Sequence, residues 1–418
     1  MRHFLFLLVV FSAFANSQQT AQNLFSQYQN ALYQIRIIEL GSGNKSSIGS
    51  GFQIDQDGLM VTNYHVVSEY VFYPEKYRIE YLDADGKTGP LELKDFDVIN
   101  DLALVRKISL SGNESAFELA TDLPEQGSNI YSLGNPHDLG MIVVPGTFNG
   151  LKKNSFYQRI HFTGSINPGM SGGPVVNSSG HIVGINVATA GNQIGFLIPL
   201  SELQNLLAGA TIQTLTVSEY KPKIQQQLMQ NQQRLFTLLN QQTWQTSELG
   251  QAMVPTKVSD FMSCWGDSNT SNKDAQFLSV ENTCRMDEQI YLANHLRTGG
   301  LELEFEWLNG KKLGEHRFYK LYSNSISSAS AGNAASKTDV TKYQCQQDKI
   351  INVNDVTNKT VFCLRAYKEF ADLYDVLFIA ATLDHRQQGL ISHFTLAGVA
   401  KEPALAFTKQ FVDAISWQ

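Results

Sequence analysis

Short apolar segments bounded by turn residues recur through the first half of the chain, and this pattern predicts strands. Residues 52–54 and 59–62 flank an Asp-Gly turn, so together they predict a β-hairpin. Further strands are predicted at residues 35–40, 77–82, 102–108, 174–176 and 181–187. Much of this half of the chain is therefore expected to be strand.

Two helices are predicted at the ends of this region. An amphipathic helical stretch begins near residue 22, and a second helix is predicted after Pro199. Ser201 and Gln204 match a capping box at the start of that second helix, and Gly209 is a suitable residue to end it.

A Gln-rich segment at residues 218–249 follows. Ile224, Leu228, Leu235 and Leu239 recur there at helical spacing, so a long connecting helix is predicted. A single apolar face of about four turns is too short to predict a coiled coil. Packing of this helix on its own domain is the preferred interpretation.

Residues 250–418 form a separate region. Apolar and acidic residues alternate from Leu301 to Trp307, which predicts a strand with one solvent-facing side. Further strands are predicted at 361–367, 376–383 and 390–399. A Ser/Ala-rich stretch at 323–337 predicts a mobile loop, and Pro403 predicts the start of a final helix with Phe407 and Phe411 on one face. We expect an α+β module.

The N-terminus has the pattern of an export signal. A basic start precedes an apolar run at residues 4–14, and Ala13-Phe14-Ala15 places small residues in an A-x-A pattern. This predicts a secretory signal peptide over residues 1–15, cut after Ala15. A membrane anchor is the weaker alternative because the run is too short to span a bilayer.

The four cysteines all lie in the C-terminal region. An even number in an exported chain predicts two disulfides among Cys264, Cys284, Cys345 and Cys363. Three pairings are possible and the sequence does not choose among them; sequential pairing is our expectation. A zinc site is the weaker alternative because no Cys-x-x-Cys pair or matching histidine spacing occurs.

Charge and length narrow the functional classes. The 418 residues suffice for two or three domains. The formal net charge of -7 argues against nucleic acid as a main partner. After the N-terminus no apolar run is long enough to span a membrane.

One glycine-rich stretch carries candidate chemistry. Gly169-Met170-Ser171-Gly172-Gly173-Pro174 has the shape of a loop built around one exposed serine. The backbone N–H groups of Gly169 and Ser171 can point into one pocket, as an oxyanion hole requires. A serine in an ordinary turn is the competing interpretation. A serine hydroxyl becomes a nucleophile only with a base and a group that orients the base.

Both partners have upstream candidates. His65 follows a predicted strand, and Asp101 begins a run of four apolar residues. A structural histidine is the alternative for His65, and Asp97 is the alternative for the carboxylate. We prefer Asp101 because Asp97 is followed by only two apolar residues before Asn100.

These segments resemble the HtrA-type branch of trypsin-like serine proteases. The resemblance covers roughly residues 25–208 and rests on the serine, histidine and aspartate segments together with four shorter motifs. These are Gly49-Ser50-Gly51-Phe52, Leu133-Gly134-Asn135-Pro136, Ile182-Val183-Gly184-Ile185-Asn186 and Gly195-Phe196-Leu197-Ile198-Pro199.

The resemblance implies a fold and a mechanism. It implies an all-β double six-stranded barrel of the chymotrypsin type for a protease domain at residues 20–210. It does not cover the rest of the chain, where the residue pattern and the cysteines predict a helical linker at 218–249 and a disulfide-containing α+β module at 250–418. His65, Asp101 and Ser171 would form a triad in the chain order of that fold. No cofactor or metal is expected. HtrA-type relatives usually carry a PDZ domain after the protease, but no glycine-flanked carboxylate-binding loop is found here.

Family position also places two further features. The base of the specificity pocket should lie near Ser165 and Ile166; neither is acidic, so small or medium apolar substrate side chains are expected. Met170 stands where digestive relatives carry a carboxylate that pairs with a new N-terminus and where HtrA-type relatives usually carry asparagine. Activation by N-terminal clipping is therefore not expected.

The leading hypothesis is an exported serine endopeptidase, periplasmic or secreted. Its expected partners are polypeptides, with unfolded proteins among the candidates, and a homo-oligomer is an option because relatives of this type are often trimers. The alternative from another class is a catalytically silent binding or chaperone protein that keeps the protease fold. A third possibility is that residues 250–418 are an adhesion or docking domain that determines the substrate.

Overall fold

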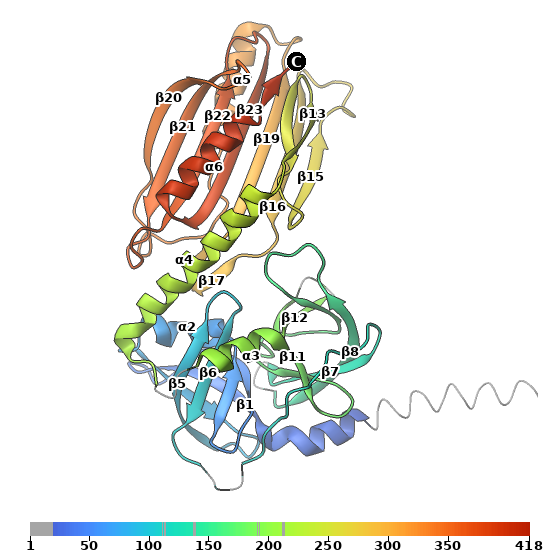
Figure 1. Ribbon diagram of the computed structural model, residues 1–418, viewed down its shortest axis with the longest axis vertical. Coiled ribbons are helices and arrows are strands. Elements are labelled where there is room, and N and C mark those ends of the chain that lie inside the picture. The colour runs from blue at the N-terminus through green and yellow to red at the C-terminus, as the bar shows by residue number, and fades with distance from the viewer. Residues whose placement is uncertain are drawn as a thin grey trace, which may run out of the picture. The chain divides into compact units, whose positions relative to one another are not determined.

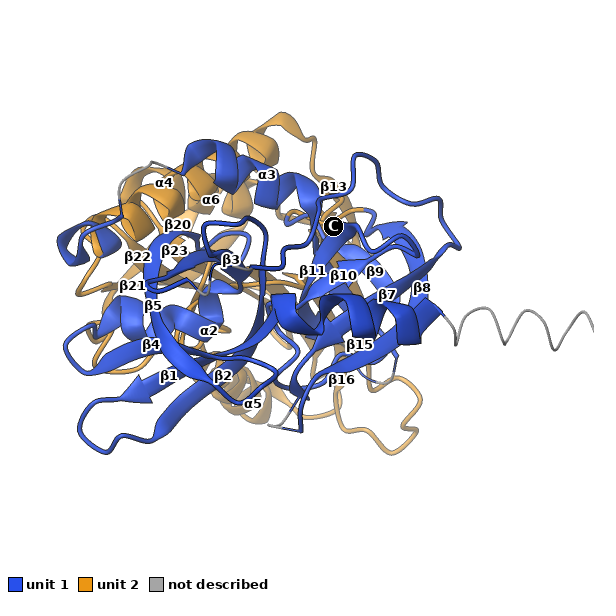
Figure 2. Cartoon of the chain, turned by 90° about the horizontal axis from the view of Figure 1, so that it is seen from below, with its two compact units in different colours: residues 1–153, 157–220 blue, residues 154–156, 221–418 orange. Residues whose placement is uncertain are grey.

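A computed structural model describes residues 20–110, 112, 114–136, 139–189, 191, 193–210 and 214–418. The signal peptide predicted at 1–15 lies outside these residues. The chain divides into two compact units, coloured separately in Figure 2. Unit 1 comprises Met1–Lys153 and Tyr157–Tyr220, and unit 2 comprises Asn154–Phe156 and Lys221–Gln418.

Unit 1 contains two closed antiparallel barrels of six strands each (Figure 1). The first barrel has the strand order β1-β2-β3-β6-β5-β4. Its strands are β1 (Leu32–Glu39), β2 (Lys45–Gln53), β3 (Leu59–Thr62), β4 (Tyr77–Leu82), β5 (Thr88–Asp97) and β6 (Leu102–Lys107). The predicted hairpin is confirmed, since Phe52 pairs with Val61 across β2 and β3.

The second barrel has the strand order β10-β11-β12-β9-β8-β7. Its strands are β7 (Asn129–Gly134), β8 (Ile142–Leu151), β9 (Ile160–Thr163), β10 (Pro174–Val176), β11 (Ile182–Thr189) and β12 (Gly195–Pro199). Two closed six-stranded antiparallel barrels confirm the predicted chymotrypsin-type fold class.

One apolar core runs through both barrels. Phe52 and Leu104 of the first barrel belong to the same buried cluster as Phe162 and Ile185 of the second. Each of these side chains is at most 1% exposed. Burial of large apolar side chains is the main source of stability, so this shared core fixes the two barrels against each other. The loops that leave the strands at this junction are held in place as a result.

Short helices flank the barrels. Residues 20–28 are helical, followed by a 3-10 turn at Gln29–Ala31, then α2 (Tyr64–Phe72) and α3 (Leu200–Gly209). The expected capping box is wrong in detail, because α3 begins one residue before Ser201 and its N-cap is Pro199, without a side-chain cap. A proline fits there because its fixed φ suits the residues that lead into a helix.

The predicted connecting helix is α4 (Val217–Gln241), which is shorter than residues 218–249. Residues 245–249 instead form strand β13, which pairs with β14. Ile224, Leu228, Leu235 and Leu239 are at most 3% exposed, so they form its buried face.

A seven-stranded antiparallel sheet dominates unit 2. Its strand order is β15-β16-β19-β23-β22-β21-β20. The strands are β15 (Met262–Ser268), β16 (Leu278–Met286), β19 (Leu301–Asn309), β20 (Gln344–Ile351), β21 (Thr357–Ala366), β22 (Tyr374–Thr382) and β23 (Gln388–Val399). Smaller pairings involve β13 (Gln245–Leu249), β14 (Ala252–Lys257), β17 (Ile290–Ala293), β18 (Leu296–Thr298) and β24 (Ser416–Trp417).

Helices cover both faces of this sheet. Helix α6 (Lys401–Asp413) lies along one face in Figure 1, where Phe411 stacks on Phe305 and Phe407 contacts Phe394. Helix α5 (Glu315–Ser328) packs its Phe318 and Tyr322 on the other face. The sequence missed this helix, so residues 323–328 end a helix and do not begin the expected loop.

Both disulfides tie an edge strand of the sheet to its neighbour. Cys264 in β15 bonds to the directly opposite Cys284 in β16, and Cys345 in β20 bonds to Cys363 in β21. The expected sequential pairing is confirmed. Because β15 and β20 are the two outer strands, each disulfide holds a strand that has only one hydrogen-bonded neighbour.

Reduction should therefore destabilise unit 2. Each disulfide closes a short loop, with sequence separations of 20 and 18 between the paired cysteines. By constraining the unfolded chain, each stabilises the fold by about 2–4 kcal/mol. All four tryptophans lie in unit 2, so tryptophan fluorescence during denaturation reports this unit. We expect the denaturation midpoint of unit 2 to fall on reduction. Four free thiols in protein from an oxidising compartment, or an unchanged midpoint after reduction, would contradict this account.

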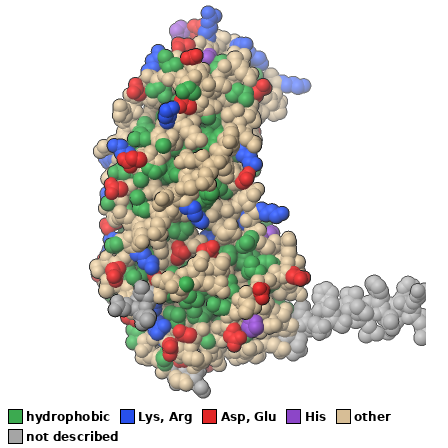
Figure 3. All heavy atoms as spheres, in the orientation of Figure 1, with side chains coloured by type: hydrophobic (Ala, Val, Ile, Leu, Met, Phe, Trp, Pro, Cys, Tyr) green, Lys and Arg blue, Asp and Glu red, His purple; other side chains and the backbone are tan. Residues whose placement is uncertain are grey.

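The described part of the chain contains no helix long and apolar enough to cross a membrane. On the face drawn in Figure 3, acidic and basic side chains are mixed among a larger area of uncharged atoms.

Candidate active site

His65 and Asp101 lie in direct contact. His65 is the second residue of α2, and Asp101 stands immediately before β6. The Nδ1 atom of His65 is 2.7 Å from Asp101 Oδ2, and the His65 backbone N–H donates to Asp101 Oδ1 at 2.8 Å. One carboxylate thus holds both the ring and the backbone of the histidine. With Asp101 accepting from Nδ1–H, the Nε2 atom is left as the proton acceptor.

The backbone of Asp101 is held in an unusual conformation. Its φ is +63°, in the left-handed region that side-chain-bearing residues seldom adopt. Asn63, which is fully buried, donates from Nδ2 to the Asp101 carbonyl at 2.8 Å. Asp97 instead stabilises its own turn, because its Oδ1 accepts a hydrogen bond from the backbone N–H of Ile99 at 2.8 Å. The structure therefore places Asp101, and not Asp97, against His65.

Ser171 lies in the tight turn before β10. The backbone N–H of Gly172 donates to Asn186 O at 3.0 Å, and the Asn186 N–H donates to Gly173 O at 2.9 Å. The Asn186 side chain donates to Leu133 O at 3.1 Å and accepts from Ser132 Oγ at 2.8 Å. The loop is thus fastened to the second barrel directly after the serine.

Close backbone contacts bring the serine loop to the histidine turn. Gly172 has φ +83°, and a Cβ added there would lie 2.4 Å from both Ser50 O and Thr62 Oγ1. A Cβ added at Gly49 would lie 2.4 Å from Val66 and 3.1 Å from Ser171 O. Only glycine fits at either position. Residues next to Ser171 therefore touch residues next to His65.

Ser50 joins the two barrels at this point. Its backbone N–H donates to Ser171 O at 2.8 Å, and its hydroxyl donates to Gly169 O at 2.7 Å. The same hydroxyl accepts from the Asn135 N–H at 2.8 Å. Strand β2 of the first barrel thereby positions the serine loop of the second.

Two backbone donors of the serine loop remain available. Within the described residues, the N–H groups of Gly169 and Ser171 donate to no acceptor, whereas the N–H of Met170 donates to Asn167 O at 3.0 Å. The hydroxyl of Ser171 likewise takes part in no hydrogen bond with the described residues. Catalytic hydrogen bonds are often long before substrate binds, so this geometry is compatible with a resting site.

Met170 points into the barrel. Its side chain is fully buried, and its Sδ accepts a weak hydrogen bond from the Asn167 N–H at 3.4 Å. Ile166 is also buried, in the core of the second barrel against Gly195, whereas Ser165 is exposed. The burial of Ile166 and the exposure of Ser165 were not predicted from the sequence. The role of these two residues in a specificity pocket remains a prediction.

Sequence reasoning missed the positioning roles of Ser50, Asn63 and Asn186. Each stands inside a segment that carried the family resemblance or the histidine, yet nothing in the sequence marks it as a bridge. A small polar residue flanked by buried strand residues is the available signal, because such a group needs partners inside the protein. The described residues include no group of three or more side chains suited to bind a metal ion.

Part of the chain is similar to known serine proteases. Residues 49–185 match the family model of the trypsin-like peptidase domain. Serine protease HTRA1 of Xenopus tropicalis is 33% identical over 170 residues, which are 38% of this chain and 35% of that protein. Protease Do-like 5, chloroplastic, of Arabidopsis thaliana is 31% identical over 194 residues, 40% of this chain and 59% of that protein.

A crystal structure of Deg5 is 28% identical, with a TM-score of 0.40, and the match covers 45% of this chain and 92% of that one.

The chain spans between about a third and three fifths of the length of the two curated relatives named above. The resemblance of the matched part of the chain to HtrA-type serine proteases is confirmed.

Proposed function

We propose that the protein is a serine endopeptidase that hydrolyses peptide bonds through Ser171, His65 and Asp101. The observation that carries the proposal is the double hydrogen bond of Asp101 to His65, beside a glycine-flanked serine whose neighbours touch the histidine turn. A purely structural histidine would not need a carboxylate to fix its ring tautomer, and it would not need to lie next to a glycine-flanked serine.

The mechanism follows from these positions. Asp101 orients the imidazole and stabilises it when it becomes charged. His65 Nε2 takes the proton of Ser171 Oγ as that oxygen attacks the substrate carbonyl, and it then protonates the leaving amine. The free N–H groups of Gly169 and Ser171 stabilise the oxyanion, and water hydrolyses the acyl-enzyme.

Small or medium apolar side chains are the proposed preference at the cleavage site. Ile166 lies under Gly195 where the pocket is expected, and neither Ile166 nor Ser165 supplies a charge for a basic side chain. A proteomic cleavage-site profile with the Ser171→Ala protein as control tests this. Enrichment of lysine or arginine before the cleaved bond would contradict it.

The pH dependence tests the base. Histidine must be neutral to accept the serine proton, and its ordinary pKa is near 6.5. The rate kcat/KM should therefore rise between about pH 6 and pH 8. The measurement uses a short peptide substrate under conditions in which chemistry limits the rate. A flat profile across this range would count against His65.

A catalytically silent binding or chaperone protein is the second candidate. The abundant uncharged polar surface and the second unit fit such a role, but they do not require a fixed His65–Asp101 pair. Covalent labelling of Ser171 separates the two candidates, because only an activated serine reacts rapidly with a fluorophosphonate.

Export to a periplasmic or extracellular location is part of the proposal. Two disulfides persist in oxidising compartments, and the N-terminal sequence has the pattern of a signal peptide. The proposed partners are polypeptide substrates, unfolded proteins among them, and a homo-oligomer is proposed by resemblance. Recovery of a reduced protein with residues 1–15 intact would contradict the location.

A further inference from the structure

Unit 2 contains a pocket of about 340 Å³ that is independent of the proposed catalytic residues. It lies where the ends of β16, β18, β19 and β23 meet the loop that follows α5. Arg285, Arg297, Glu302, Asn333 and Thr395 line it, together with Met286, Asp287, Gln289, Gly300, Leu301, Gly332 and Ala397. This volume is in the range of pockets that hold small molecules.

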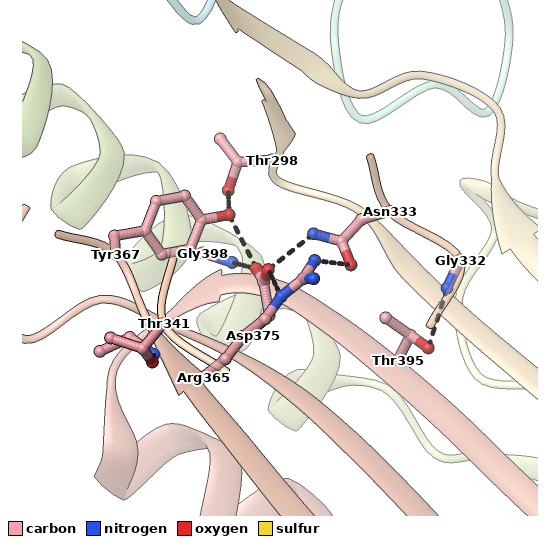
Figure 4. A network of polar contacts seen from close by, with 10 residues as sticks. Thr298, Gly332, Asn333, Thr341, Arg365, Tyr367, Asp375, Thr395 and Gly398 are labelled. Atoms are coloured by element: carbon pink, nitrogen blue, oxygen red, sulfur yellow. Dashed lines mark hydrogen bonds and ion pairs between the residues drawn. The ribbon is translucent and has the colours of Figure 1, made fainter. Parts of the chain in front are cut away.

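One wall of the pocket is a loop that the sheet holds firmly. Asn333 donates from Nδ2 to the buried Asp375 at 2.8 Å and accepts from Arg365 at 3.2 Å, as Figure 4 shows. The backbone N–H of the neighbouring Gly332 donates to Thr395 Oγ1 at 3.3 Å. The Asn333 side chain is therefore engaged with the sheet, and the wall is preformed.

Asp375 is the centre of this anchorage. It is fully buried, and its two oxygens accept from Arg365 Nε at 2.7 Å, Tyr367 OH at 2.7 Å and Gly398 N at 3.1 Å, besides Asn333. Four donors around one buried carboxylate fix the residues that carry them.

Two arginines bring positive charge to the pocket. Arg285 lies over the ring of Trp265 at 5.8 Å, and Arg297 lies over the ring of Tyr291 at 5.4 Å. Neither guanidinium forms an ion pair or hydrogen bond with any residue that the structure describes. A cation–π contact with an aromatic ring orients a guanidinium group and leaves its N–H groups available to bind an anion.

The acidic residues of the pocket have other partners. Glu302 shares a hydrogen bond with Glu304, and His393 Nδ1 lies 2.9 Å from Glu304 Oε2. Burial and the nearby Glu304 raise the pKa of Glu302, whereas His393 and Arg285 act in the opposite direction. Asp287 Oδ2 accepts from Ser263 Oγ at 3.3 Å. Glu302 and Asp287 thus each have a partner within unit 2.

We propose that this pocket binds the anionic group of a small ligand, a carboxylate or a phosphate, between Arg285 and Arg297. Guanidinium groups match the geometry of both anions through paired N–H donors. The site goes beyond the proposed peptidase activity, because none of its residues belongs to the triad, and it gives unit 2 a ligand-binding role.

Calorimetric titration of the full-length Ser171→Ala protein with citrate and with inorganic phosphate tests the proposal. Both titrations are made at one ionic strength, so that nonspecific charge effects are equal. We expect at least one probe to bind with a Kd of about 1 mM or below. Tighter binding of citrate would identify a carboxylate ligand, and tighter binding of phosphate a phosphate ligand.

Arginine variants locate the site. Arg285→Gln and Arg297→Gln should each weaken binding by about tenfold, because each removes a charged donor. Arg317→Gln, on the exposed surface of α5, is the matched control and should bind like the parent protein. The proposal is overturned if neither probe binds saturably, or if the Arg285→Gln/Arg297→Gln double variant binds as tightly as the control while tryptophan fluorescence shows unit 2 folded.

Discussion

Replacing Ser171 by alanine should lower the rate of peptide hydrolysis by roughly 10⁴- to 10⁶-fold, and His65→Ala should have a similar effect. The removed hydroxyl is the nucleophile of the covalent step, and the removed imidazole is the base that activates it. Both residues are partly exposed, so neither change should unfold the barrels. The measurement is kcat/KM on a short peptide substrate with purified protein.

Ser178→Ala is the matched control for the serine variant. Ser178 is exposed in the turn between β10 and β11 of the same barrel. Its loss should leave kcat/KM unchanged, and thermal unfolding should show that all three variants are folded. Undiminished hydrolysis by folded Ser171→Ala protein would exclude this residue as the nucleophile.

Replacing Asp375 by asparagine should lower the free energy of unfolding of unit 2 by about 3 kcal/mol. The carboxylate is fully buried and pairs with Arg365, whose side chain is 13% exposed. An asparagine keeps the shape but turns an NH₂ group toward two of the four donors, and Arg365 loses its counter-charge. Breaking a buried ion pair costs about 3–5 kcal/mol, and partial access of Arg365 to water favours the lower value.

Urea denaturation followed by tryptophan fluorescence measures this effect, because all four tryptophans belong to unit 2. The control is Asp274→Asn, an exposed carboxylate whose loss should change the free energy by no more than about 0.5 kcal/mol. Equal midpoints for the two variants would show that the network around Asp375 contributes little to stability.

The sequence predicted the protease region well because its signals are local. Turn residues bracket the strands of the first barrel, and the strand expected at residues 77–82 has those bounds in the structure. The serine, histidine and aspartate segments could be found because each side chain must sit at the end of a strand or in a tight turn. Such turns restrict which residues can occupy them.

Contacts between distant segments could not be predicted. The αL conformation of Asp101 and its hydrogen bonds to His65 depend on β3, α2 and β6 meeting in space. Ser50 joins Gly169 and Ser171 across more than one hundred residues of chain, and its sequence neighbours reveal only a strand. The pattern of residues along the sequence does not show which distant residues will form hydrogen bonds with each other.

Unit 2 was predicted less fully for the same reason. Alternation identified β19, but helix α5 escaped because its serines and polar residues have the composition of a loop. Packing of Phe318 and Tyr322 on the sheet overrides that composition. Nothing in the sequence indicated that Asn333, Arg365 and Tyr367 would surround Asp375, since the loop that carries Asn333 meets the β21–β22 hairpin only after folding.

The most direct test of the proposed serine peptidase is labelling with a fluorophosphonate, followed by mass spectrometry of the intact protein and its peptides. We predict one adduct per chain, on Ser171, formed rapidly at pH 8. Labelling should be absent in the Ser171→Ala protein and strongly slowed in the His65→Ala protein. A folded protein that gives no adduct on Ser171, or one that is labelled equally fast without His65, would contradict the proposed triad.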